Sequence, residues 1–207
     1  GEYSVEEVDK LTGPAIGRPK SATFRTADIA GLDTMCHVAN GVYDKCKDDE
    51  LREVFKLPDF LQRMLDNNML GSKTGKGFYK KIKDDNGKSK ILALDLNTFK
   101  YNEQKKVSYE TLKNAKKCRK RDEKFRTLIS GNDKASEFYK ENFARMFGYV
   151  QNRIPEISDD ITSIDAALKT GFGWKDGPFE IWNYIGVKEG VELMKNFDLK
   201  PAVWIND

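Results

Sequence analysis

The residue types that most often carry acid–base or nucleophilic chemistry are scarce in this chain. His37 is the sole histidine, and histidine is the side chain whose unperturbed pKa lies nearest neutrality. No serine or cysteine can be placed beside it from the sequence, and its neighbours Cys36 and Val38 are apolar. We therefore interpret His37 as a structural or partly buried residue, and we predict no catalytic residue in this chain.

The cysteines suggest neither a disulfide framework nor a metal site. There are three of them, Cys36, Cys46 and Cys118, with no C-x-x-C spacing and no histidine cluster nearby. An odd number in such an arrangement is more typical of packing residues than of nucleophiles or zinc ligands. A reducing compartment is the simplest interpretation, and no metal is expected.

Two glycine-rich stretches imitate nucleotide-binding loops. Residues 171–177 read G-x-G-x-x-x-G, which is one residue too long for the dinucleotide fingerprint and follows a helical pattern where that fingerprint requires a strand. Residues 71–77 resemble a phosphate loop, but three residues separate the glycines where four are needed, and Gly77 stands where a magnesium-binding Ser or Thr is required. We expect no cofactor to bind to either stretch.

A basic run between Lys105 and Arg126 is the third candidate site. Phosphate-binding helices can have this composition, but Glu110, Asp122 and Glu123 offset part of the charge. Solvated helix faces commonly look the same. The net charge of the whole chain is +3 with 33% charged residues, so we expect no nucleic-acid partner.

The elements that must position these residues are mainly helical. Apolar residues recur at helical spacing in most of the chain, which predicts helices at about 4–12, 24–31, 33–46, 58–71, 108–130, 134–153 and 187–194. Between them, residues 78–83 and 88–96 flank an Asn86-Gly87 pair, which predicts a small β-hairpin insertion near 78–96. The predicted fold class is mainly α.

An internal repeat indicates two related domains. Residues 17–33 have a diverged second copy at 173–187. Asp9 and Asp165 each lie eight residues before the first glycine of their copy. Because the match includes spacing, we predict two tandem helical domains, at 1–104 and 105–207.

The bulk composition favours a soluble intracellular protein. With 207 residues, 39% of them hydrophobic, the chain can bury a core of its own. No run approaches the roughly 18 apolar residues of a membrane span, and the first residues are acidic, unlike a signal peptide. We expect a cytoplasmic protein without a membrane partner. The start at Gly1, without methionine, suggests a piece of a longer protein.

The residues described so far resemble the C-terminal helical region of the 3-hydroxyacyl-CoA dehydrogenases of fatty-acid β-oxidation. Residues 17–33 are similar to that family's glycine-proline-aromatic, aspartate and glycine-leucine-aspartate signature, and residues 71–79 are similar to its KTGKGFY segment. Residues 173–186, with Gly-Pro-Phe-Glu at 177–180, fit the signature better still. Multifunctional members carry two such helical domains in tandem, of the type found in the C-terminal part of 6-phosphogluconate dehydrogenase.

The resemblance implies a division of labour. In the family, an upstream Rossmann domain binds NAD and supplies a His–Glu pair, whereas the helical region closes over acyl-CoA and forms the dimer or pseudo-dimer contact. No segment here matches the NAD domain, and the asparagine that the family contributes from its first helix would fall before Gly1. The chain is thus expected to be inactive alone. The resemblance places Arg18, Pro19 and Phe24 at the substrate side, where they approach the pantetheine or acyl tail. The alternative is that these three residues only shape the turn and do not contact the substrate.

A second hypothesis belongs to a different class of function. The chain would then be a non-catalytic helical interaction module that kept the fold without the chemistry. The full reading frame distinguishes the two hypotheses, because only a dehydrogenase fragment requires a Rossmann unit immediately upstream.

Overall fold

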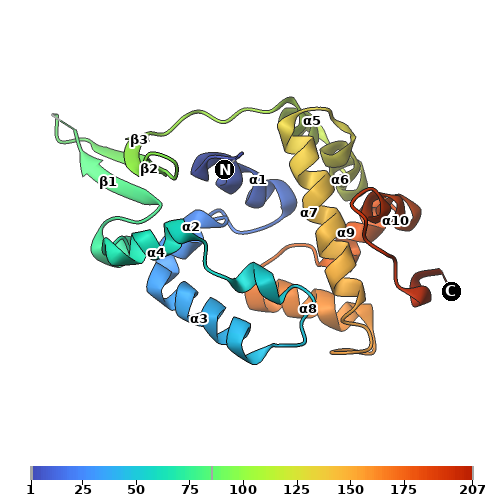
Figure 1. Ribbon diagram of the computed structural model, residues 1–207. Helices are drawn as coiled ribbons and strands as arrows, with labels where there is room; N and C mark the ends of the chain where they lie inside the picture. The colour runs from blue at the N-terminus through green and yellow to red at the C-terminus, as the bar shows by residue number, and fades with distance from the viewer. Residues whose placement is uncertain (1, 85, 207) are drawn as a thin grey trace. The chain divides into compact units, whose positions relative to one another are not determined.

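The structure is a computed structural model that describes residues 2–84 and 86–206, and its elements are shown in Figure 1. Contacts between residues divide the chain into two compact units. The first contains the residues up to Thr12 together with Ser21–Val107, and the second contains Gly13–Lys20 and everything from Ser108 onward. That the chain consists of two related domains, at 1–104 and 105–207, stays a prediction. The compact units differ from these ranges because residues 13–20 pack with the second unit.

The first unit combines short helices with a small sheet. Its helices are α1 (Val5–Thr12), α2 (Phe24–Ala30), α3 (Leu32–Lys45) and α4 (Asp59–Asp66), with 3-10 turns at Arg52–Phe55 and Ser72–Thr74. A capping box opens α1, where the Glu7 amide donates to Ser4 Oγ and the Ser4 amide donates to Glu7 Oε2. The described residues form a mainly α unit, as the apolar periodicity predicts.

The sheet has one strand more than the sequence indicates. Strands β1 (Tyr79–Lys83), β2 (Ser89–Asp95) and β3 (Lys100–Glu103) pair antiparallel in that order, with Tyr79 opposite Ala93 and Leu94 opposite Tyr101. The predicted hairpin is therefore incomplete. The chain turns back after β2 because Asp95 Oδ1 accepts the amides of residues 97 and 98, and the polar sequence of β3 carries no alternating apolar signal.

The core of the first unit lies between the helices and the sheet. Phe78 is its largest fully buried side chain, and its ring centroid lies 4.3 Å from that of Phe24. The other fully or nearly buried members come from α1, α2, α3, α4 and β2 and the segment after α4: Val5, Ala27, Leu32, Cys36, Leu61, Met64, Met69 and Leu94. Helix α4 ends five residues before the predicted Gly71, because Asn68 adopts a positive φ of 51° and the Met69 amide turns back to Met64 O.

The second unit is helical in the part that the structure describes. Its helices are α5 (Glu110–Lys117), α6 (Arg121–Ser130), α7 (Lys134–Gln151), α8 (Ile161–Phe172), α9 (Pro178–Ile185) and α10 (Val187–Lys195), with 3-10 turns at Pro14–Ile16 and Val203–Asn206. The pattern at 108–130 is split into α5 and α6, because Cys118 and Lys120 take extended backbone conformations.

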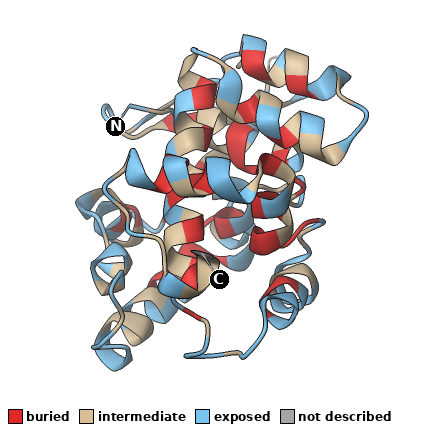
Figure 2. Cartoon of the chain, turned by 90° about the vertical axis from the view of Figure 1, so that its right-hand side faces the viewer, coloured by how far each residue is buried: buried red, intermediate tan, exposed pale blue. Residues whose placement is uncertain are grey.

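Stacked aromatic rings form the core of the second unit. Rings of α7 stack at centroid distances of 5.7 Å for Tyr139 with Phe143 and 6.1 Å for Phe143 with Phe147, and Phe147 stacks on Trp182 of α9 at 4.8 Å. Figure 2 shows the buried residues as stripes on helices whose other sides are exposed. Helices α9 and α10 are thus held against α7 by one continuous apolar face.

No helix among the described residues has the length and apolarity that a bilayer crossing requires.

Candidate functional site

The turn at Gly17 is packed into the second unit by backbone contacts. Gly17 has a left-handed φ of 74°, and its carbonyl accepts a hydrogen bond of 2.9 Å from the Lys175 amide. A Cβ at Gly17 would lie 2.7 Å from Asp176 Oδ2 and 3.2 Å from Lys175 Cβ. The turn therefore requires glycine both for its conformation and for this close approach.

Arg18 is a half-buried cation within the second unit. Its guanidinium carbon lies 4.0 Å from the ring centroid of Trp174, and its Nε is buried with no hydrogen-bond partner among the described residues. Burial lowers the pKa of Arg18 to about 10, against an opposing effect of Tyr139. The side chain remains protonated at neutral pH and packs against an aromatic face.

Pro19 and Phe24 have different surroundings. Pro19 is exposed next to Gly173, whereas Phe24 packs against Phe78 in the core of the first unit. Arg18 and Pro19 thus belong to one compact unit and Phe24 to the other. Their role at the substrate side stays a prediction, and the packing of Phe24 is a structural reason for an aromatic residue there.

Asp9 of α1 anchors the N-terminus of α2. Its carboxylate accepts the amides of Phe24 at 2.6 Å and of Arg25 at 3.0 Å, together with the Tyr79 hydroxyl at 2.8 Å. A carboxylate is favourable at this end of a helix because the free amides and the helix dipole are positive there. Burial raises the pKa of Asp9, and these hydrogen bonds oppose the rise. Desolvation and the Asp9 charge also raise the pKa of the Tyr79 hydroxyl well above its ordinary value.

Asp28 explains the glycine-rich segment at 71–79. Its two carboxylate oxygens accept the amides of Phe78 and Tyr79, each at 2.8 Å. Gly71 and Gly77 both make close approaches to it, since a Cβ on Gly71 would lie 2.3 Å from Asp28 O. Burial raises the pKa of the Asp28 carboxyl, and the two amide bonds oppose the rise. The segment thus binds a carboxylate of its own chain, and the phosphate-loop interpretation is unnecessary.

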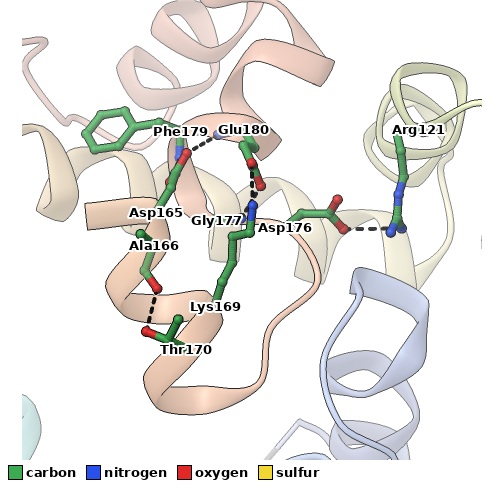
Figure 3. A network of polar contacts seen from close by, with 9 residues as sticks. All are labelled: Arg121, Asp165, Ala166, Lys169, Thr170, Asp176, Gly177, Phe179 and Glu180. Atoms are coloured by element: carbon green, nitrogen blue, oxygen red, sulfur yellow. Dashed lines mark hydrogen bonds and ion pairs between the residues drawn. The ribbon is translucent and has the colours of Figure 1, made fainter. Parts of the chain in front are cut away.

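The same device recurs in the second unit, where Asp165 of α8 anchors α9 (Figure 3). Asp165 accepts the amides of Phe179 at 2.8 Å and of Glu180 at 2.9 Å. Gly177 leaves room for it, since a Cβ there would lie 2.3 Å from Asp165 Oδ1. Asp9 and Asp165, which have equivalent positions in the sequence repeat, therefore make equivalent hydrogen bonds. Asp9 also accepts the Thr23 amide at 3.1 Å, whereas the corresponding residue of the second unit, Pro178, has no amide to donate.

Two ion pairs complete this network. Lys169 Nζ lies 2.7 Å from Glu180 Oε1, and Glu180 Oε2 accepts the Gly177 amide at 2.8 Å. Asp176 is buried, and its Oδ2 lies 3.2 Å from Arg121 NH1. Burial raises the pKa of Asp176, whereas the nearby Arg121 charge lowers it. These groups neutralise one another inside the unit.

The remaining reactive side chains do not gather around these anchors. His37 is exposed on α3, so the interpretation of it as partly buried is wrong; its position is on the helix face away from the core. Cys36 is buried, but Cys46 is exposed after the end of α3, so the packing interpretation fails for Cys46. Among the described residues no group of three or more metal-ligating side chains could hold a metal ion.

The arrangement therefore fixes backbone geometry and offers no nucleophile–base pair among the residues described above. Sequence reasoning missed Asp28, Tyr79 and Trp174 as members of these anchors. The signal that could have found the first anchor was present, because the constant spacing from Asp9 to Gly17 and from Asp165 to Gly173 indicates a geometry that is repeated within the chain.

Comparison with known proteins shows what this chain is similar to. Residues 1–81 match the family model described as 3-hydroxyacyl-CoA dehydrogenase, C-terminal domain. The whole chain is 44% identical over 207 residues to a probable 3-hydroxyacyl-CoA dehydrogenase of Bacillus subtilis (strain 168), of which it covers 26%. A probable 3-hydroxyacyl-CoA dehydrogenase of Deinococcus radiodurans is 49% identical over 85 residues, which are 41% of this chain and 24% of the relative.

The similarity also extends to a multifunctional protein. A putative fatty acid oxidation complex trifunctional enzyme of Rickettsia prowazekii (strain Madrid E) is 26% identical over 196 residues, covering 93% of this chain and 25% of the relative. The matched part of the chain spans about a quarter of the length of each of these relatives. Residues 1–81 are therefore similar to the C-terminal domains of 3-hydroxyacyl-CoA dehydrogenases, and the whole chain is similar to one part of a probable 3-hydroxyacyl-CoA dehydrogenase.

Proposed function

We propose that this chain is part of an NAD-dependent 3-hydroxyacyl-CoA dehydrogenase of fatty-acid β-oxidation that acts in the cytoplasm. The observation that carries the proposal is the 44% identity over the whole chain to a probable 3-hydroxyacyl-CoA dehydrogenase. In the intact protein the chain would form the acyl-CoA side of the site, as a lid, and the dimer or pseudo-dimer contact. The duplicated Asp9 and Asp165 anchors support its origin as two tandem related domains.

The residues present here do not fit NAD. A dinucleotide site requires a strand, a glycine-rich turn and a helix N-terminus in succession, whereas residues 171–177 begin in the last turn of helix α8 and continue past its C-terminal end. The amides that open α9 are already bonded to Asp165. NAD binding and the hydride-transfer step are therefore assigned to an upstream Rossmann domain, and no chemical step is assigned to the residues of this chain.

The anchors of this chain would hold the backbone of each unit rigid. In the first unit Asp9 and Asp28 fix the two ends of α2, and in the second unit the bond to Lys175 fixes the Gly17 turn. A rigid support of this kind positions a substrate without touching the reacting atoms. Arg18 presents a permanent positive charge on such a support, a charge that suits the phosphates of coenzyme A.

The first test is an activity assay of the 207-residue chain beside the longer protein that contains it. With acetoacetyl-CoA and NADH, the chain alone should give no turnover, and the longer protein should oxidise NADH. Turnover by the isolated chain, or none by the longer protein with a range of acyl-CoA lengths, would contradict the proposal.

A second test concerns the substrate side. In the longer protein, Arg18→Ala should raise KM for acyl-CoA about tenfold, equivalent to about 1.4 kcal/mol of binding, while kcat changes little. Lys20→Ala is the matched control, because Lys20 is an exposed cation at the end of the same turn. Equal KM values for Arg18→Ala, Lys20→Ala and the unchanged protein would remove Arg18 from the substrate side.

The non-catalytic interaction module remains the second candidate. It is favoured by the hydrogen bonds that Asp9, Asp28 and Asp165 accept from amides of their own chain. A reading frame without an upstream Rossmann unit would decide for it.

A further inference from the structure

Three cations gather around one buried carboxylate in the second unit. Arg121 is the first residue of α6, and its NH1 lies 3.2 Å from Oδ2 of Asp176 in the loop between α8 and α9 (Figure 3). Lys124 follows three positions later and therefore shares a helix face with Arg121. Lys175 directly precedes Asp176 and is exposed. The three cations thus come from α6 and from one loop of the same compact unit.

The carboxylate neutralises only part of this positive charge. Asp176 carries a single negative charge and pairs with Arg121, whereas neither lysine of the cluster forms an ion pair among the described residues. Two acidic residues in the first turn of α6, Asp122 and Glu123, lie one and two positions after Arg121, so they do not share its helix face. Three cations and one carboxylate leave an excess of two positive charges.

The excess charge acts most clearly on the half-buried Lys124. Burial lowers the pKa of Lys124, and the charges of Arg121 and Lys175 lower it further, whereas Asp176 opposes them. An ammonium group in this position loses hydration and is repelled by like charges. Glu180 also acts on Asp176, but it is paired with a lysine of α8 and is occupied there. A bound anion would remove the repulsion among the cations.

We propose that Arg121, Lys124 and Lys175 bind a phosphate monoester. Such a group carries about two negative charges at neutral pH and three acceptor oxygens, so it matches the excess charge and offers one oxygen to each cation. Arg121 can keep its pair with Asp176 and still donate to a ligand, because a guanidinium has five N–H donors. A nucleic-acid phosphodiester carries one charge only and would leave half of the excess uncompensated.

The 3′-phosphate of coenzyme A is a phosphate monoester, and dephospho-coenzyme A lacks it. In naming coenzyme A as the source of the phosphate, the inference rests on the proposed function; the cation cluster itself does not. The site would then hold the end of the coenzyme that is remote from the acyl group. Contacts with a remote, non-reacting part of a substrate contribute binding energy without taking part in the chemistry.

Site-resolved lysine labelling of the longer protein tests the site. Reductive methylation with formaldehyde and cyanoborohydride, followed by peptide mass spectrometry, gives the rate at Lys124 separately from all other lysines. Saturating butyryl-CoA should slow this rate at least about tenfold, because a bound phosphate covers the amine and raises its pKa, whereas butyryl-dephospho-CoA should slow it less than about twofold. Lys116 on α5 is the internal control, since it is an exposed lysine of the same unit; its rate should not change.

A variant and a second ligand complete the test. Lys175→Gln keeps the backbone bond to Gly17 and should raise the butyryl-CoA concentration that half-protects Lys124 about threefold, and Lys116→Gln should leave that concentration unchanged. Inorganic phosphate, compared with chloride at the same ionic strength, should also protect Lys124. Protection by phosphate but by neither thioester would support the site and assign it to a different phosphate monoester.

Three results would overturn the proposal: no protection of Lys124 by any of these ligands, equal protection of Lys124 and Lys116, or protection that Lys175→Gln does not weaken. Oxidation of NADH by the longer protein with acetoacetyl-CoA is measured separately. An active enzyme in which Lys124 stays unprotected would overturn the site alone, and a protected Lys124 in a protein without turnover would overturn the proposed function alone.

Discussion

Asp28 and Gly77 approach each other so closely that only a hydrogen atom fits on the glycine. A Cβ at Gly77 would lie 2.0 Å from Asp28 Oδ1 and 2.6 Å from Gly71 Cα. This approach places the Asp28 carboxylate on the amides of Phe78 and Tyr79. A buried carboxylate needs such bonds, since burial without them destabilises the folded state by several kcal/mol. The glycine-rich segment and the aspartate signature are therefore two halves of one interaction.

Replacing this glycine should destabilise the first unit strongly. Gly77→Ala forces Asp28 or the strand to move, and we expect the free energy of unfolding to fall by about 3 kcal/mol. Urea denaturation followed by circular dichroism measures the change. Gly41→Ala is the matched control: Gly41 is in α3, nothing lies within 4 Å of the added Cβ, and the variant should gain about 0.5–1 kcal/mol. Equal stability of the two variants would show that the close approach is relaxed in solution.

The sequence predicted the mainly α class and most helices, because apolar residues recur at helical spacing and the stops are glycine or proline. It missed β3, whose residues are polar, and it extended one helix to Gly71, because Met69 continues the apolar stripe although Asn68 ends the helix. Such endings depend on a single positive φ, which the apolar pattern does not encode. The repeat was visible because helix anchors constrain both residue type and spacing.

The candidate site was less predictable than the fold. Arg18, Pro19 and Phe24 lie close together in one signature, which suggested one surface, but Phe24 contributes to a core and Arg18 packs on Trp174. The aromatic partner of Arg18 comes from a distant part of the sequence, and periodicity carries no information on such pairs. The anchoring role of Asp9 likewise required coordinates, since its partners are mostly backbone amides, which every sequence has.

The Asp165 anchor should contribute to the stability of the second unit. Asp165→Asn keeps one acceptor oxygen but presents an NH2 group to the other amide of α9, which is thus left without an acceptor. We expect a loss of about 1–3 kcal/mol in the free energy of unfolding. All three tryptophans, Trp174, Trp182 and Trp204, belong to this unit, so tryptophan fluorescence in urea reports on it directly. Asp159→Asn, at an exposed position before α8, is the control and should change little. A similar small change for Asp165→Asn would mean that the anchor is dispensable.

Acid should remove the contribution of one helix cap in a defined pH range. Asp160 caps α8 and accepts the side chains of Thr162 and Ser163 and the Ser163 amide. These bonds lower its pKa from 3.8 to about 2. Since the folded value lies below the ordinary one, the unfolded chain binds the proton first. The stabilisation is then complete above about pH 5 and is lost as the pH falls to about 2.

A neutral cap provides the comparison for this pH range. Asp160→Asn retains a good N-cap without the ionisable group. The stability of the unchanged chain minus that of Asp160→Asn should therefore be constant above about pH 5 and decline between about pH 4 and pH 2. Measuring urea midpoints of both proteins over this range cancels the titration of all other groups. A difference that does not vary with pH would exclude the cap as the cause.

Arg18 has two opposing effects on the stability of the folded chain, and their magnitudes can be compared. Its contact with Trp174 is worth about 0.5–1 kcal/mol as a cation–π interaction, whereas the buried Nε without a partner among the described residues destabilises by about 1–3 kcal/mol. The second effect is larger, so Arg18→Met, which keeps the apolar stem, should leave stability unchanged or raise it by up to about 2 kcal/mol. Arg18→Ala also removes the stem and should be less stable than Arg18→Met. Tryptophan fluorescence in urea ranks the three proteins. If Arg18→Met were clearly less stable than the unchanged chain, the cation would be a net structural contributor, and its retention would need no functional explanation. The expected order instead implies that this charge is maintained against stability, as is common for groups that act on a ligand.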